Sequence, residues 1–98
     1  MTPLKTICMN CKKLFNQVQE HYWGKQFHLL IYKTETEEAL AKKIMALPWE
    51  GKGSLMELDI SVANGHMVSG RQEDEMNALW HQLRRELYHT AKFIAGPQ

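Results

Sequence analysis

Two cysteines three residues apart, Cys8 and Cys11, are the first residues whose type and spacing could do chemistry. A C-x-x-C pair can give two ligands to zinc or form the redox pair of a thiol–disulfide enzyme. A structural zinc site needs four ligands, and none of the five histidines forms a second pair at the usual spacing. Both cysteines also fall on the apolar face of an expected helix, where free cysteine behaves as a small hydrophobic residue. We therefore predict two buried thiols, no metal ion and no cofactor.

Two further patterns could belong to an enzyme. Residues 51–54 (GKGS) have the residue types of a phosphate-binding loop, but a Walker A loop places its lysine after the second glycine and before a helix. Glu57 and Asp59 share one face of an expected strand, as paired acid–base carboxylates can. That face alternates with an apolar one, so we expect both carboxylates in solvent. Neither pattern supplies a nucleophile, a base and an orienting group, and we predict that the protein is not an enzyme.

A row of basic side chains runs along the last quarter of the chain, which has the pattern of a long helix. His81, Arg85 and His89 are spaced by four residues, so they share one line on that helix. Such a row can bind an acidic protein surface or phosphates, and it is also the solvated side of any amphipathic helix. Trp23 and Trp49 are expected beside loops, where large rigid side chains anchor a partner or cap the core edge. These five residues are the predicted partner-binding set.

The first third of the chain is basic and offers a second kind of binding surface. Residues 1–33 contain five lysines and one glutamate. Four of these lysines could contact nucleic-acid phosphates while a tyrosine stacks on a base, namely Lys5, Lys12, Lys13 and Lys25 with Tyr22. Against this stand the near-neutral pI of 7.8 and the lack of arginine in this third. Binding to DNA or RNA is therefore the alternative function.

Length and composition describe a small globular protein. The chain has 98 residues, 44% of them hydrophobic and 23% charged, with a net charge of +1. These values predict one domain over residues 1–98 with a core of its own. The chain has no 18-residue apolar run, so we expect no membrane span, and its lysine-containing start does not resemble a secretory signal. With two closely spaced cysteines, we predict a cytoplasmic protein.

The elements expected to position these side chains alternate between helical and strand patterns. A first helix is expected to begin at Thr2-Pro3 and to end at Gly24. Residues 26–33 (QFHLLIYK) have the apolar, aromatic composition of a buried strand. A second helix, capped by Thr34 or Thr36, should run to about Ala46 before Pro48.

The second half of the chain predicts a hairpin followed by the long helix. Residues 54–63 alternate between apolar and polar, and Asn64-Gly65 is typical of a two-residue hairpin turn, so residues 66–69 should return antiparallel. Ser69 and Gln72 suit a capping box before a helix over residues 71–95, which Gly96-Pro97 should end. Its expected apolar stripe consists of Met76, Leu79, Trp80, Leu83, Leu87, Ala91 and Ile94.

These elements predict an α+β fold in the order α-β-α-β-β-α, with a three-stranded sheet and the long C-terminal helix packed on one face. The function that we predict is a non-catalytic protein-interaction module, an adaptor, regulator or inhibitor that docks on a larger protein as a monomer or homodimer. Small size and near-neutral charge are also typical of compact inhibitor proteins of bacteria and phages.

Overall fold

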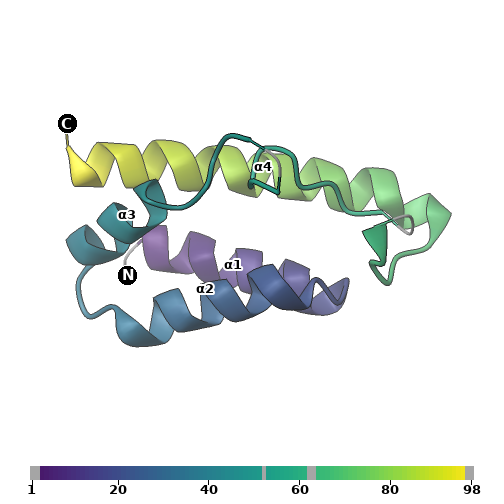
Figure 1. The fold of residues 1–98 in the computed structure, drawn as a ribbon, viewed down its shortest axis with the longest axis horizontal. Helices are drawn as coiled ribbons and strands as arrows, with labels where there is room; N and C mark the ends of the chain where they lie inside the picture. The colour runs from purple at the N-terminus through teal and green to yellow at the C-terminus, as the bar shows by residue number, and fades with distance from the viewer. Residues whose placement is uncertain (1–2, 52, 62–63, 97–98) are drawn as a thin grey trace.

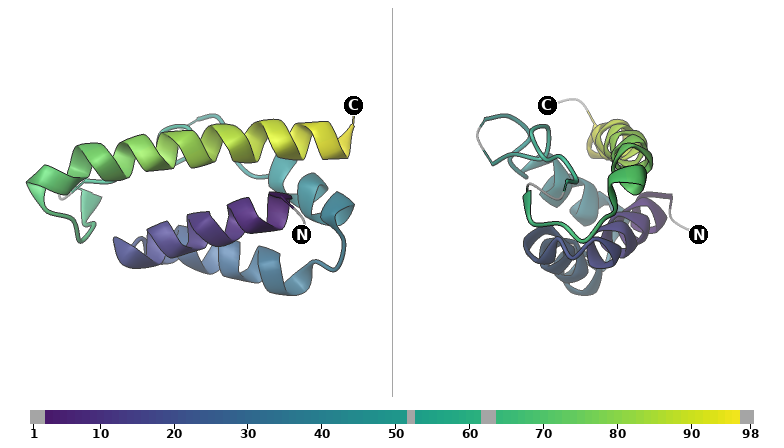
Figure 2. Two further views of the ribbon diagram at one scale, coloured as in Figure 1. Left: turned by 180° about the vertical axis from the view of Figure 1, so that it is seen from behind. Right: turned by 90° about the vertical axis from the view of Figure 1, so that its right-hand side faces the viewer.

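The computed structural model describes residues 3–51, 53–61 and 64–96, and these residues form four α-helices and no strand (Figure 1). The helices are α1 (Pro3–Gln17), α2 (His21–Lys33), α3 (Glu37–Met45) and α4 (Gly70–Ala95). Helices α1 and α2 form an antiparallel hairpin, and α4 lies along it in the direction opposite to α1 (Figures 1 and 2). We call residues 46–69, which connect α3 to α4, the linker. The predicted α+β fold with a three-stranded sheet is therefore wrong for the described chain.

Residues 26–33, predicted as a strand, lie inside helix α2. Their nearly continuous apolar run fits a period of 2 as well as a period of 3.6, so periodicity alone does not separate strand from helix. The buried residues Trp23 and Phe27 are four apart, and the partly buried Ile31 follows four residues later. This spacing forms one helical face, which packs against the core.

Helix α1 ends seven residues before the predicted stop at Gly24. The N–H of Gln19 donates to the carbonyl oxygen of Asn16, and the N–H of Glu20 donates to that of Phe15, which is the bonding pattern of a Schellman motif. Gln19 adopts the left-handed conformation (φ 59°) that glycine usually supplies there. Gly24 is buried within α2, and a Cβ atom at this position would come within 2.8 Å of the Asn16 side-chain oxygen. The predicted N-cap at Thr2 lies outside the described residues.

The predicted strands of residues 54–63 and 66–69 are wrong where the structure describes them, because this segment is irregular. Side chains of α4 make hydrogen bonds to the backbone of this segment, of the kind that a partner strand would make in a sheet. The side-chain oxygen of Asn77 accepts from the Ile60 N–H at 2.7 Å, and the Asn77 amide donates to the Ile60 carbonyl oxygen at 2.7 Å. The indole N–H of Trp80 donates to the Leu58 carbonyl oxygen at 3.0 Å. The linker thus satisfies its backbone without a sheet.

The Asn64-Gly65 pair lies in a turn but does not join two strands. The N–H of His66 donates to the Ser61 carbonyl oxygen at 3.1 Å, and the Ser61 N–H donates to the His66 ring nitrogen Nδ1 at 3.0 Å. His66 Nε2 lies 3.2 Å from a carboxylate oxygen of Glu20, which fastens the turn to the start of α2. The predicted pairing of residue 62 with residue 67 involves a position outside the described residues.

The helices predicted over residues 34–46 and 71–95 are both confirmed. Thr36 caps α3, where its hydroxyl accepts from the Ala39 N–H at 3.1 Å. Ser69 is the N-cap of α4, and the Gln72 side chain accepts from the Ser69 N–H at 3.5 Å. The α4 stripe is buried at four positions and partly buried at two others, whereas Leu79 is 41% exposed.

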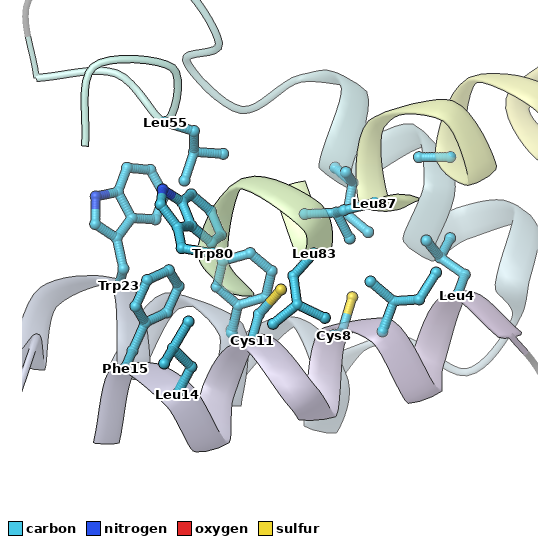
Figure 3. Packing of buried hydrophobic residues seen from close by; sticks show 14 of the residues in the cluster. Leu4, Cys8, Cys11, Leu14, Phe15, Trp23, Leu55, Trp80, Leu83 and Leu87 are labelled. Atoms are coloured by element: carbon cyan, nitrogen blue, oxygen red, sulfur yellow. The ribbon is translucent and has the colours of Figure 1, made fainter. Parts of the chain in front are cut away.

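All four helices contribute to one hydrophobic core (Figure 3). Trp80 is fully buried, with its ring centroid 4.9 Å from that of Phe15. Cys8 and Cys11 are both fully buried on the side of α1 that faces α4, which confirms the predicted burial of the thiols (Figure 3). Burial raises the pKa of Cys8 to about 12. Burial, together with the nearby Cys8 and Glu86, also raises the pKa of Cys11.

Two observations concern binding sites and membranes within the described ranges. His, Cys, Asp and Glu side chains do not gather there in groups of three that could hold a metal ion. None of the four helices combines the length and the apolar composition needed to cross a bilayer.

Candidate functional site

The end of α3, the linker and α4 together form a groove on one side of α4. It consists of two adjoining hollows of about 430 Å³ and 280 Å³, which share Met56 and Tyr88. We call this surface the α4 groove. The larger hollow is lined by Met45, Trp49, Glu50, Met56 and Tyr88, and the smaller one by Met56, His81, Arg84, Arg85, Tyr88 and His89. Figures 1 and 2 show the linker running along α4 on this side.

One end of the α4 groove is apolar, and the rigid side chain of Trp49 fixes its shape. The indole N–H of Trp49 donates to the Ile44 carbonyl oxygen at 2.9 Å, so the ring is held at the end of α3. Tyr88 meets this ring edge-on, with the ring centroids 5.1 Å apart. Met56, which is 55% exposed, lines the same hollow as these two rings. A flexible thioether beside rigid aromatic rings is a surface that adapts to apolar side chains of different shapes.

The other end of the α4 groove is basic because α4 presents one stripe of cationic side chains. Positions 81, 85 and 89 are spaced by four residues, and positions 84, 88 and 92 form a second row with the same spacing, so the two neighbouring rows make one broad face. Arg85, His89 and Lys92 are exposed there. The Lys92 ammonium lies 5.9 Å from the Tyr88 ring centroid, so the positive charge continues onto the apolar end.

Arg84 joins the basic stripe to the linker. Its guanidinium donates to the carbonyl oxygens of Leu55 at 3.3 Å and Met56 at 3.2 Å, and it lies 5.8 Å from the Trp80 ring centroid. These contacts fix the backbone that carries Met56, which keeps that side chain at the edge of the groove. Arg84 thus positions the groove, whereas Arg85 is free to meet a partner.

The charge of the α4 groove is predominantly positive. Two carboxylates lie at its margins: Glu50 lines the apolar hollow, and Asp59 faces His81 with 3.8 Å between carboxylate oxygen and ring nitrogen. The cationic residues are Arg84, Arg85 and Lys92, and the two histidines add charge when protonated. An acidic ligand is therefore electrostatically favoured over a basic one.

The structure brings four of the five predicted partner-binding residues to this groove, namely Trp49, His81, Arg85 and His89. Trp23 lies elsewhere: it is 4% exposed and packs in the core beside Phe27, with the ring centroids 6.5 Å apart. Sequence reasoning missed Arg84 and Tyr88, although both lie three or four residues from predicted members. It also missed Met45 and Met56, because their place in the groove depends on the path of the linker.

The predicted nucleic-acid residues divide into two groups. Lys5, Lys12 and Lys13 line a cleft between α1 and the end of α2. Tyr22 and Lys25 are exposed on α2 but do not line that cleft.

The acidic residues considered for catalysis are exposed, as expected for solvated carboxylates. Glu57 accepts a hydrogen bond from the Gly53 N–H at 3.3 Å, and Asp59 faces His81. Both line a hollow of about 280 Å³ whose wall includes the Glu20–His66 pair. Glu20 also caps α2 by accepting from the Trp23 N–H, so this pair stabilises the fold. The lysine of the GKGS segment lies outside the described residues.

Comparisons of the chain with protein families, with curated proteins and with solved structures found no match. Function therefore has to be inferred from the chemistry of the surface itself.

Proposed function

We propose that this protein is a non-catalytic interaction module that binds a larger protein through the α4 groove. The observation that carries the proposal is the meeting of an apolar hollow and a basic stripe in one groove, formed by segments far apart in the sequence. Most of the binding energy of protein interfaces comes from a few aromatic and arginine residues near their centre, which are the residue types gathered here.

The chemistry of the groove favours an acidic partner segment with one or two large apolar side chains. The apolar side chains would enter the hollow between Trp49, Met56 and Tyr88, while aspartate or glutamate residues would pair with Arg85 and Lys92. An amphipathic helix satisfies both demands, because residues three or four apart present its apolar and acidic groups in register with a groove. We further propose a cytoplasmic setting, which the two free, buried cysteines support.

A defined peptide tests this partner chemistry directly. The probe is an 18-residue amphipathic helix rich in glutamate with leucine and tryptophan on one face, and the control peptide has lysine at each glutamate position. Titration into isotope-labelled protein should shift amide signals of α4 and residues 49–56 with the acidic peptide only. Raising the salt concentration should weaken binding, because exposed charge pairs are screened. Equal shifts with both peptides, or shifts confined to other surfaces, would contradict the proposal.

Matched variants connect the peptide to a natural partner. Arg85→Glu reverses a charge in the groove, and Lys13→Glu makes the same change on α1 outside it. Both side chains are exposed, so both variants should fold. Affinity capture from nuclease-treated lysate should lose its partner with Arg85→Glu and keep it with Lys13→Glu. A partner that both variants capture equally would place the interaction outside the α4 groove.

A further inference from the structure

A second binding surface lies between the outer face of α1 and the end of α2. This cleft has a volume of about 620 Å³, larger than either hollow of the α4 groove. We call it the α1–α2 cleft. It is lined by Lys5, Met9, Lys12, Lys13, Ile31, Tyr32, Thr34 and Glu35. Its size falls within the roughly 300–1,000 Å³ typical of small-molecule sites.

Helix α1 supplies the charge of the cleft. Lys5, Met9, Lys12 and Lys13 are four, three and one residues apart along α1, which places them on one side of the helix, next to the stripe that carries the buried cysteines. Three lysines thus stand against the single carboxylate of Glu35 among the lining residues. Lysine ammonium groups on flexible stems are suited to phosphate oxygens, which they contact as point charges.

Helix α2 supplies an aromatic ring beside this charge. Tyr32 is 73% exposed, and the Lys12 ammonium lies 5.8 Å from its ring centroid. The His28 ring lies beside Tyr32, with its centroid 4.4 Å away and its plane inclined by 42° to that of Tyr32. Met9, 47% exposed, and the partly buried Ile31 add apolar contacts.

A buried hydroxyl at the edge of the cleft lacks a hydrogen-bond partner. Thr34 lines the cleft, and its Oγ1 atom is buried without a partner in the described structure. Because this atom is buried, a ligand in the cleft reaches it only if the Thr34 side chain rotates toward the cleft.

We propose that the α1–α2 cleft binds a nucleotide. The three lysines contact the phosphate, and the base lies against Tyr32 and the apolar side chains of Met9 and Ile31. Stacking of a base on an aromatic side chain adds to binding and tolerates all bases, whereas lysines alone would attract any polyanion. The adjacency of ammonium groups and an exposed ring is what favours a nucleotide over an acidic peptide. This site is independent of the α4 groove, since it shares no lining residue with it.

The nucleotide that binds can be a free nucleotide or part of a single-stranded nucleic acid, and the experiment distinguishes these two ligands. The probes are AMP and ATP as free nucleotides, a ten-residue oligo-dT and oligo-rA as single strands, and deca-glutamate as a polyanion without bases. Binding is followed by amide shifts of residues 5–13 and 31–35 at 0.05 and 0.15 M salt. We expect saturable shifts with at least one nucleotide probe and weaker ones with deca-glutamate. Response to free nucleotides identifies a small-molecule site, and response to the oligomers alone identifies a single-strand site.

Two pairs of matched variants decide whether the cleft itself is responsible. Lys12→Gln should weaken binding by about 5- to 10-fold, whereas Lys25→Gln, an exposed lysine of α2 outside the cleft, should change it less than twofold. Tyr32→Leu should weaken binding by a similar factor and Tyr32→Phe should preserve it, because only the first removes the ring. All three side chains are at least partly exposed, and unchanged signals from α3 and α4 verify the fold of each variant.

Three outcomes would overturn the proposal. One is the absence of saturable shifts with every nucleotide probe. Another is deca-glutamate binding as tightly as the oligomers, which would reduce the cleft to a site of charge attraction. The last is an equal loss of binding in Lys12→Gln and Lys25→Gln, or full binding by Tyr32→Leu.

Discussion

Replacing Asn77 by alanine tests whether α4 holds the linker in place of a partner strand. The Asn77 side chain makes two hydrogen bonds of 2.7 Å, one with the N–H and one with the carbonyl group of Ile60. The Ile60 side chain is fully buried in the core, so its backbone is fixed where these bonds form. Asn77→Ala leaves both backbone groups without their partner.

The expected loss of stability follows from these two bonds. An intramolecular hydrogen bond contributes about 1 kcal/mol net, and Asn77 is only partly buried, so water can replace its side chain in part. Two bonds therefore amount to ~2 kcal/mol. Alanine favours a helix over asparagine by ~0.5 kcal/mol, which leaves a net loss of ~1.5 kcal/mol. At 4–8 °C per kcal/mol for a chain of this size, Tm should fall by roughly 6–12 °C.

Urea denaturation and amide hydrogen exchange together measure the effect. Asn10→Ala is the matched control, because Asn10 is exposed on α1 and this variant gains the same helix propensity. The free energies of unfolding of the two variants should differ by ~2 kcal/mol, and the Ile60 amide should exchange faster only in Asn77→Ala. A difference below ~0.5 kcal/mol with unchanged exchange would show that Asn77 does not hold the linker.

Three further predictions concern the core, the α1–α2 turn and the thiols. Leu83 is 6% exposed, so Leu83→Ala should lower the free energy of unfolding by about 2–5 kcal/mol. Arg85→Ala should change it by less than ~0.5 kcal/mol. Urea melts, paired with mass measurements by light scattering, compare the two variants. Gln19→Gly should raise stability by up to ~1 kcal/mol in the same melts because it removes the left-handed strain at φ 59°, whereas Gln19→Ala should give no gain. The buried thiols of Cys8 and Cys11 should resist thiol reagents until the protein unfolds. Since burial raises the pKa of Cys8 from 9.0 to about 12, its contribution to stability is full below pH 9 and is lost as the pH rises toward 12. A Cys8→Ala variant should show a smaller loss in pH-dependent melts, because only Cys11, whose pKa burial also raises, then remains.

Some site residues could be predicted from the sequence because they share one helix. The line of His81, Arg85 and His89 depends only on helical periodicity, so it lies where the spacing predicts. The other residues of the α4 groove could not be predicted, because Trp49 and Met56 come next to these side chains only through the path of the linker. Trp23 was expected beside a loop because Gly24 resembled a helix stop. The stop lies instead at Gln19, a residue type that seldom signals a left-handed turn.

Several features of this protein follow from signals between residues that are close together in the sequence. A long apolar stripe with a capping box specifies α4, Thr36 before a short apolar edge specifies α3, and Cys8 and Cys11 on a helical stripe specify buried thiols. Where local signals were ambiguous, tertiary packing selected the conformation of the segment. Residues 26–33 suit a strand or a helix, and packing of Phe27 against α1 selects the helix. Residues 54–61 alternate like a strand but have no strand to pair with, so their backbone bonds to Asn77, Trp80 and Arg84 of α4. A strand needs a partner from elsewhere in the chain, whereas a helix satisfies its own backbone. For that reason the helices predicted over residues 34–46 and 71–95 are present, and the predicted sheet is absent from the described residues.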